Sequence, residues 1–70
     1  MSEKAEFASS DHVTFVKDYQ ATSIPSGTAI TVKAGTAGVI TQALGTNYTV
    51  HIGSALIRVP KRDGEVLARS

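Results

Sequence analysis

Two histidines are the residues of this chain best suited to chemistry at neutral pH. His12 and His51 carry imidazole nitrogens, which serve widely as metal ligands and general bases. They lie far apart in the sequence, and no carboxylate or thiol stands at metal-ligand spacing from either. We therefore expect both to be surface residues on strands, and we expect no metal site and no cofactor.

Acidic and hydroxyl side chains form no better catalytic pattern. General acid–base chemistry and nucleophilic attack both need a partner group at a defined distance. The residues considered are Asp11, Asp18, Asp63 and Glu65 among the acids and Ser9, Ser10 and Ser54 among the hydroxyls. Only an accident of folding would pair these carboxylates, and none of the serines has a nucleophile context, so we expect that the protein is not an enzyme.

Basic side chains offer an alternative function. They could form a strip that follows a nucleic-acid backbone, with aromatic rings stacking on bases. Acidic residues are interleaved with them, and the net charge is only +1, so a mixed, solvated surface is the preferred interpretation. The residues concerned are Lys17, Lys33, Arg58, Lys61 and Arg62, with Phe15, Tyr19 and Tyr48 as the rings.

Length and composition limit how these residues are positioned. A chain of 70 residues forms one domain at most and buries only roughly 60% of its unfolded surface. Because there is no cysteine to supplement the core, we expect a homodimer. No apolar run is long enough for a membrane span or a signal-peptide core, so we expect a cytoplasmic protein that binds no membrane.

The chain is organised around residues 39–59, VITQALGTNYTVHIGSALIRV, where apolar residues recur at every second place across two turn signals. This pattern predicts a three-stranded antiparallel meander. For the first hairpin we expect a three-residue loop over 45–47 with Asn47 in the left-handed region, which sets Gln42 opposite Val50. For the second we expect a two-residue Gly53-Ser54 loop, glycine first as a type II′ turn requires.

The meander has one strongly apolar face. We expect the core on this face, with Gln42 as its one misfit; its apolar members are Ile40, Leu44, Tyr48, Val50, Ile52, Ile57 and Val59. The opposite face is more apolar than a solvated face should be, so we expect something to cover part of it. The candidate interaction surface is Val39, Gln42, Ala43, Leu56 and Arg58.

The flanking segments complete the predicted fold. We expect a flexible tail over 1–10 and one domain over 11–70, with further strands at 12–18 and 29–33 and a loop or a ragged strand extension at 19–23. Segment 65–68 fits either a short strand or one helical turn. The fold class is all-β, a small five-stranded antiparallel barrel or half-open sandwich of SH3-like type.

Several segments together resemble one known family. The residues that carry the resemblance are Lys17-Asp18, IPSGT at 24–28, Ala34-Gly35-Thr36, ITQALG at 40–45, Tyr48-Thr49-Val50 and Arg58-Val59. They resemble the small N-terminal domain of SufT-type iron–sulfur cluster assembly proteins over most of residues 13–67. This chain departs from the family pattern at Gly38 and Thr46, and the family's second domain is absent from it.

The resemblance implies a role in delivering iron–sulfur clusters to client enzymes. Without cysteine the chain lacks the thiolates that normally hold such clusters, so that role would run through protein contacts. We therefore expect a non-catalytic interaction module accessory to iron–sulfur cluster or metalloprotein maturation, with an assembly component or client as its partner. A nucleic-acid-binding small barrel is the alternative, and an enzyme subunit fragment is a third, weaker one.

Overall fold

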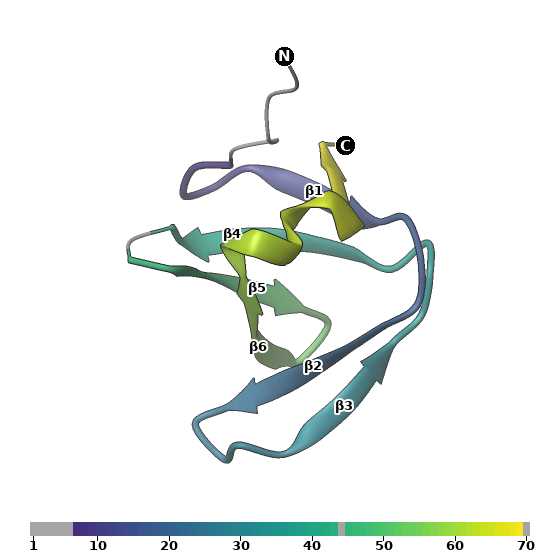
Figure 1. Ribbon diagram of the computed structural model, residues 1–70, viewed down its shortest axis with the longest axis vertical. Coiled ribbons are helices and arrows are strands. Elements are labelled where there is room, and N and C mark those ends of the chain that lie inside the picture. The colour runs from purple at the N-terminus through teal and green to yellow at the C-terminus, as the bar shows by residue number, and fades with distance from the viewer. Residues whose placement is uncertain (1–6, 44, 70) are drawn as a thin grey trace.

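The computed structural model describes residues 7–43 and 45–69, and these fold as one antiparallel sheet with a short 3-10 helix (Figure 1). All-β was the predicted class, and this is confirmed. The elements are β1 (His12–Phe15), β2 (Tyr19–Ile24), β3 (Ala29–Val32), β4 (Ala37–Gln42), β5 (Asn47–Ile52), β6 (Ala55–Pro60), η1 (Lys61–Val66) and β7 (Leu67–Arg69).

The seven strands lie in the order β3-β2-β6-β5-β4-β1-β7, with β3 and β7 at the edges. The sheet bends strongly around one core, and η1 crosses in front of its open side (Figure 1). The sheet is not closed, because β3 and β7 do not pair with each other. The predicted barrel of five strands is therefore corrected to an open sheet of seven.

The predicted meander is present as β4-β5-β6, and its second hairpin has the expected register. Val50 lies opposite Ile57 and Tyr48 opposite Val59, with Gly53 and Ser54 as the two-residue loop. Gly53 has a φ of +50°, the left-handed value that the first position of a type II′ turn requires.

The predicted register of the first hairpin is wrong. Gln42 lies opposite Thr49 and not opposite Val50, and a β-bulge between Ile40 and Gln42 then brings Ile40 opposite Val50. The extra residue in the bulge lets two successive polar side chains, Thr41 and Gln42, both reach solvent. Gln42 is therefore not a buried misfit, because the bulge moves it off the core face.

The turn chemistry of this hairpin also differs from the prediction. Asn47 is the first residue of β5 and pairs with Pro60, so it does not hold the left-handed position. Gly45 does, with a φ of +73°. The predicted core residue Leu44 lies outside the described residues.

Two strands near the start of the chain differ from the predicted pair. β1 ends at Phe15 and not at Asp18, and the segment expected to be a loop or a ragged strand extension forms β2. The alternation in β2 is hidden because its inward positions include small residues: Ala21 is buried, while the large Ile24 lies on the opposite side in register with Leu56. β2 and β3 then form a hairpin whose turn includes Gly27 at a φ of +78°.

The core lies in the concave side of the bent sheet. Its buried apolar residues come from all seven strands, from η1 and from the segment before β1, and they are Phe7, Val13, Phe15, Ala21, Val32, Ile40, Tyr48, Val50, Ile57, Val59, Val66 and Leu67. Ile52, which was predicted to be in the core, is partly buried against this cluster. Most of the predicted core face is therefore confirmed.

The end of the chain answers the question left open for segment 65–68. Val66 closes the 3-10 helix and Leu67 begins β7, so the segment contains both a helical end and a strand start. Leu67 pairs with Phe15 of β1, and both side chains are buried. β7 therefore pairs with the edge of β1 that faces away from β4.

Phe7 and the residues after it belong to the ordered body, although they fall within the segment predicted to be a tail. The Phe7 side chain is buried. The Ser10 amide donates a hydrogen bond to the carbonyl of Ile40 at 2.6 Å, and the Ile40 amide donates to the carbonyl of Asp11 at 2.8 Å. These bonds extend the β1–β4 ladder backwards by two residues.

Candidate interaction surface

The face of the sheet opposite the core, here named the outer face, follows from strand register and alternation. Its members alternate with the buried residues along each strand and lie opposite one another between strands. They are His12, Thr14, Gln20, Thr22, Ile24, Ala29, Thr31, Ala37, Val39, Gln42, Asn47, Thr49, His51, Leu56, Arg58, Pro60 and Ala68.

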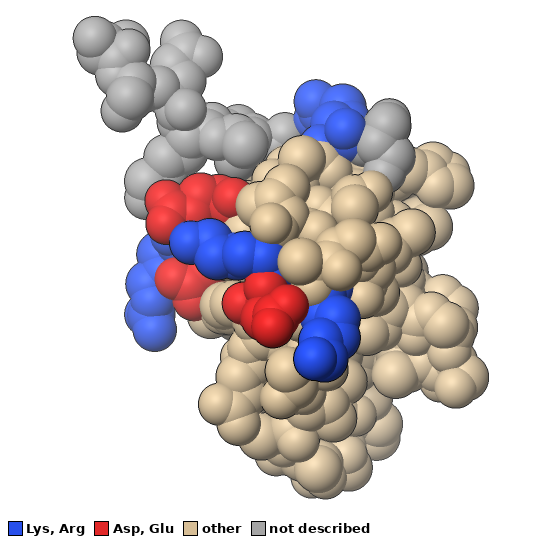
Figure 2. Space-filling view, turned by 90° about the vertical axis from the view of Figure 1, so that its right-hand side faces the viewer, with Lys and Arg blue, Asp and Glu red and all other residues tan. Residues whose placement is uncertain are grey.

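Arg58 is the only residue of the outer face with a formal charge at neutral pH, and no acidic residue lies on it. The other charged residues of the described chain lie in turns, in η1 or at strand ends. In Figure 2, most Lys, Arg, Asp and Glu side chains gather over one part of the molecule with the two signs interleaved, and one further basic group lies apart from them at the top of the view. The charge is therefore separated from the outer face.

Two cross-strand rows hold four of the five residues predicted for the interaction surface. In the first row Val39 lies opposite His51, and His51 opposite Leu56. In the second row Gln42 lies opposite Thr49, and Thr49 opposite Arg58. The two rows lie side by side on β4, β5 and β6.

Ala43, the fifth predicted residue, is placed differently. It follows β4 and packs, partly buried, against the core. Its carbonyl oxygen accepts a hydrogen bond from Nζ of Lys61. Ala43 thus helps to hold η1 against the meander and is not part of the outer face.

The first row also brings near one another two histidines that lie far apart in the sequence. Val39 lies opposite His12 of β1 on one side and opposite His51 of β5 on the other. Since these strands are two apart, the histidine Cα atoms are separated by roughly 10 Å with Val39 between them. No cluster of three or more His, Cys, Asp or Glu residues suited to a metal ion occurs in the part of the chain that the structure describes.

Leu56 is the most exposed large apolar residue of the outer face, with 38% of its surface accessible. Ile24 lies opposite it on β2 and is half-buried. Together with Val39 they form an apolar band on β4, β6 and β2, in which His51 of β5 lies between Val39 and Leu56. Depletion of charge around apolar side chains is typical of the centre of a protein–protein interface.

A second group of residues, which we name the clasp, lies at the opposite side of the sheet from this band. It consists of Tyr48, Lys61 and Arg69, and it surrounds the Phe7 ring. Phe7 meets Tyr48 edge to face, with ring centroids 5.6 Å apart, and Arg69 lies over the Phe7 ring at 5.3 Å. Lys61 lies over the Tyr48 ring at 5.4 Å.

Sequence reasoning missed the clasp because its three residues and the Phe7 ring come from four separate segments. Phe7 stands in a stretch without periodicity, and only the pairing of β1 with β7 brings Arg69 near it. A lone aromatic residue among small and charged ones was the one available signal. Such a residue often anchors a terminal segment.

No helix in the described part of the chain has the length and apolar character needed to cross a membrane.

The chain was compared with protein-family models, with curated proteins and with solved structures, and none of the three comparisons found a match.

Proposed function

We propose that this protein is a non-catalytic interaction module that acts through protein contacts made by its outer face. The observation that carries the proposal is the absence of formal charge from this face apart from Arg58, beside the exposed Leu56. A face that served only to contact water would have no reason to exclude charge, since small proteins gain solubility from it.

A second copy of this chain is the occupant that we propose for the apolar band. In a two-fold dimer the same patch meets itself, so an uncharged face brings no like-charge repulsion to its own copy. The small core of a chain of this length adds a reason for association. Val39, His51 and Leu56 would lie at the centre of the contact.

The connection with iron–sulfur cluster or metalloprotein maturation is also a proposal, and its support is the resemblance to the SufT-type small domain. An assembly component or client enzyme would be the protein partner. At the level of architecture, the strong bend of the sheet around a single core supports an SH3-like relationship. Cytoplasmic location is part of the same proposal.

The dimer is tested by light scattering over a range of protein concentrations. Wild type should give twice the chain mass of 7.3 kDa, and Leu56→Lys should give the monomer mass. Thr46→Lys is the matched control, because it adds the same charge at an exposed loop position off the outer face. Thr49→Lys should weaken the dimer too, since Thr49 lies between Gln42 and Arg58. A monomer mass for wild type at all concentrations would contradict the proposal.

The maturation role is tested in cells that lack the protein, by measuring the activity of an enzyme that needs a [4Fe–4S] cluster. Wild type should restore that activity and Leu56→Lys should not, at equal protein levels. Nucleic-acid binding is the competing explanation, and the interleaved charges in Figure 2 argue against it. Retention on single-stranded nucleic acid that falls steeply with salt would favour that explanation over ours.

A further inference from the structure

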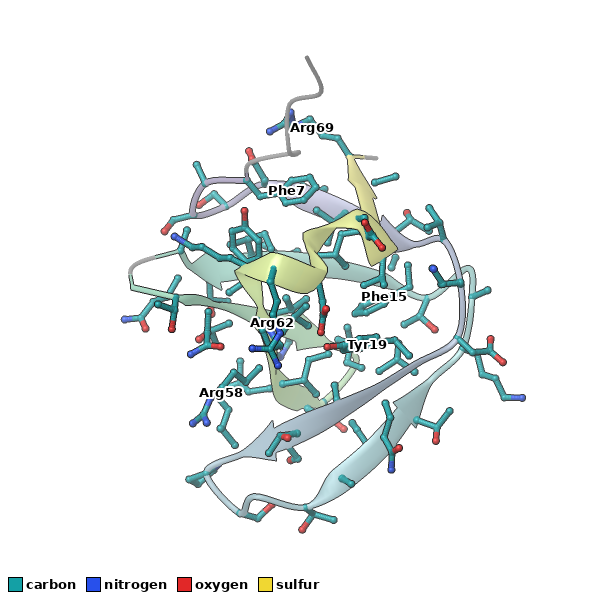
Figure 3. The ribbon with its side chains drawn as sticks, viewed as in Figure 1. Phe7, Phe15, Tyr19, Arg58, Arg62 and Arg69 are labelled. Atoms are coloured by element: carbon teal, nitrogen blue, oxygen red, sulfur yellow. The ribbon has the colours of Figure 1, made fainter. Side chains whose placement is uncertain are left out.

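The segment Phe7–Asp11 contacts the body of the protein in the manner of a bound peptide. One ring enters the clasp, and the next three residues, Ala8 to Ser10, are exposed. Phe7 and Arg69 lie close together at one end of the molecule (Figure 3). A single ring provides the apolar contact, so release of that ring would leave the segment held only by hydrogen bonds and by the ion pair between Asp11 and Arg69.

The ring residue and the carboxylate of the segment both have partners in the body. The Phe7 amide donates a hydrogen bond to the hydroxyl oxygen of Tyr48 at 3.2 Å, and the ring packs against the same tyrosine. Four residues later the carboxylate of Asp11 forms an ion pair with Arg69 at 3.1 Å. Arg69 therefore contacts both ends of the segment, the ring and the carboxylate.

The clasp is electropositive as well as aromatic. Lys61 covers the Tyr48 ring and Arg69 covers the Phe7 ring, so the two contacting rings lie between two cations. Cations over ring faces attract aromatic ligands, and they also favour a ligand that carries negative charge. A segment with both an aromatic ring and a carboxylate satisfies the two preferences at once.

The connection between ring and carboxylate is strained. The Asp11 amide donates to the carbonyl of Ala8 at 3.0 Å, which closes a turn, and Ser10 within it has a φ of +77°. Holding a serine in the left-handed region costs free energy, and a ligand that binds without this turn avoids that cost. The intramolecular segment is thus a less than ideal occupant of its own site.

From these contacts we propose that the clasp is a docking site for an aromatic–acidic segment of a partner protein, and that Phe7–Asp11 occupies it when the partner is absent. The partner segment carries an aromatic residue with a carboxylate four positions further on. Tyr48 and Arg69 contact the ring, and Arg69 pairs with the carboxylate. The inference does not depend on the outer face or on its dimer.

The test uses the full chain with Phe7→Ala and a synthetic peptide of residues 3–12 as the probe, followed by amide chemical shifts. The peptide should shift the Tyr48, Lys61 and Arg69 signals of the variant in a saturable way. Wild type should bind the peptide at least about tenfold more weakly than the variant does, because its own segment fills the site most of the time. The same peptide with alanine in place of its phenylalanine is the control, and it should cause no shifts.

Hydrogen exchange of wild type provides a measurement that needs no variant. The Phe7 amide should exchange through local opening, at least about tenfold faster than the amides of the β5–β6 ladder that need global unfolding. Equal protection of both would overturn the proposal, because the segment would then be part of the cooperative core. A Phe7→Ala chain that does not fold, or one that folds and shows no peptide shifts at millimolar peptide, would overturn it as well.

Discussion

The phenolic hydroxyl of Tyr19 donates a hydrogen bond of 2.5 Å to Oδ2 of Asp63, and this bond joins β2 to η1 across the open side of the sheet. The Tyr19 ring also stacks on Phe15 of β1, with centroids 6.4 Å apart. Figure 3 shows both rings in the middle of the molecule. Tyr19 thus links three segments that do not pair with one another in the sheet.

This bond predicts a loss of stability in alkali. Burial, the hydrogen bond to Asp63 and the charge of that carboxylate together raise the pKa of Tyr19 from its ordinary value of 10 to about 12, and the charge of Arg62 opposes them. Because the folded-state pKa is the higher one, the stabilisation is complete below pH 10 and is lost as the pH rises to 12.

The measurement is denaturant unfolding of wild type and Tyr19→Phe between pH 7 and 11.5. At pH 7 the variant should be less stable by about 1 kcal/mol, since the lost bond is only partly shielded from water. That difference should shrink above pH 10, because phenylalanine cannot ionise while the other groups titrate in both proteins. A difference that stays constant to pH 11.5 would contradict the assignment.

The side chains around Gly38 leave little room for a larger residue at this position of β4. A Cβ at this position would lie 2.8 Å from Cγ1 of Val50 and from Cγ2 of Ile52, and 3.1 Å from the carbonyl oxygen of His51. Gly38→Ala should therefore lower the free energy of unfolding by about 1–3 kcal/mol. Ala37→Val, at the exposed neighbouring position, should change it by no more than about 0.5 kcal/mol.

A double mutant separates this packing effect from other causes. Adding Val50→Ala to Gly38→Ala makes room for the new methyl group, so the two substitutions together should cost less than the sum of their separate costs. Strict additivity would show that Val50 does not resist the methyl group.

The backbone conformation of Ser10 restricts which residues can replace it in the segment before β1. Its φ of +77° lies in the region that β-branched residues resist most strongly. Ser10→Val should destabilise the fold by about 1–2 kcal/mol or release the preceding segment. Ser9→Val is the control, because Ser9 is exposed and lacks a positive φ; it should be close to neutral in thermal unfolding.

Valine substitutions at two nearby positions of the first hairpin should have different effects on stability. Asn47→Val should be nearly neutral, because Asn47 begins β5 and valine suits a strand. Gly45→Val should destabilise by about 1 kcal/mol or more, since Gly45 holds the positive φ. Thermal unfolding of the two variants decides between this arrangement and the three-residue loop expected from the sequence.

The meander could be predicted from the sequence because its alternation is long and one of its turns admits a single geometry. Gly53-Ser54 fixes the register of β5 against β6 by loop length alone. The first hairpin could not be predicted in the same way, because the bulge beside Thr41 shifts the register by one within the strand. The strand therefore has one register on each side of the bulge, and the expected pairing of Gln42 with Val50 holds on neither side.

The placement of residues on the outer face could be predicted in part. Val39 and Leu56 were recognised because apolar residues on the second face need cover, and the structure places them in one row. The adjacency of His12 to Val39 depends on β1 lying beside β4, which no local pattern shows. The clasp depends on a still longer connection, because Asp11 and Arg69 are 58 positions apart.

The position of β1 between β4 and β7 also has a consequence for synthesis on the ribosome. The β4-β5-β6 meander needs only neighbouring strands and can form early, whereas β7 is made after the other six strands and pairs with the edge of β1 that faces away from β4. Until Leu67 emerges, β1 of the growing chain has an unpaired edge at Phe15. This interval is when a chaperone would have most reason to bind the nascent protein.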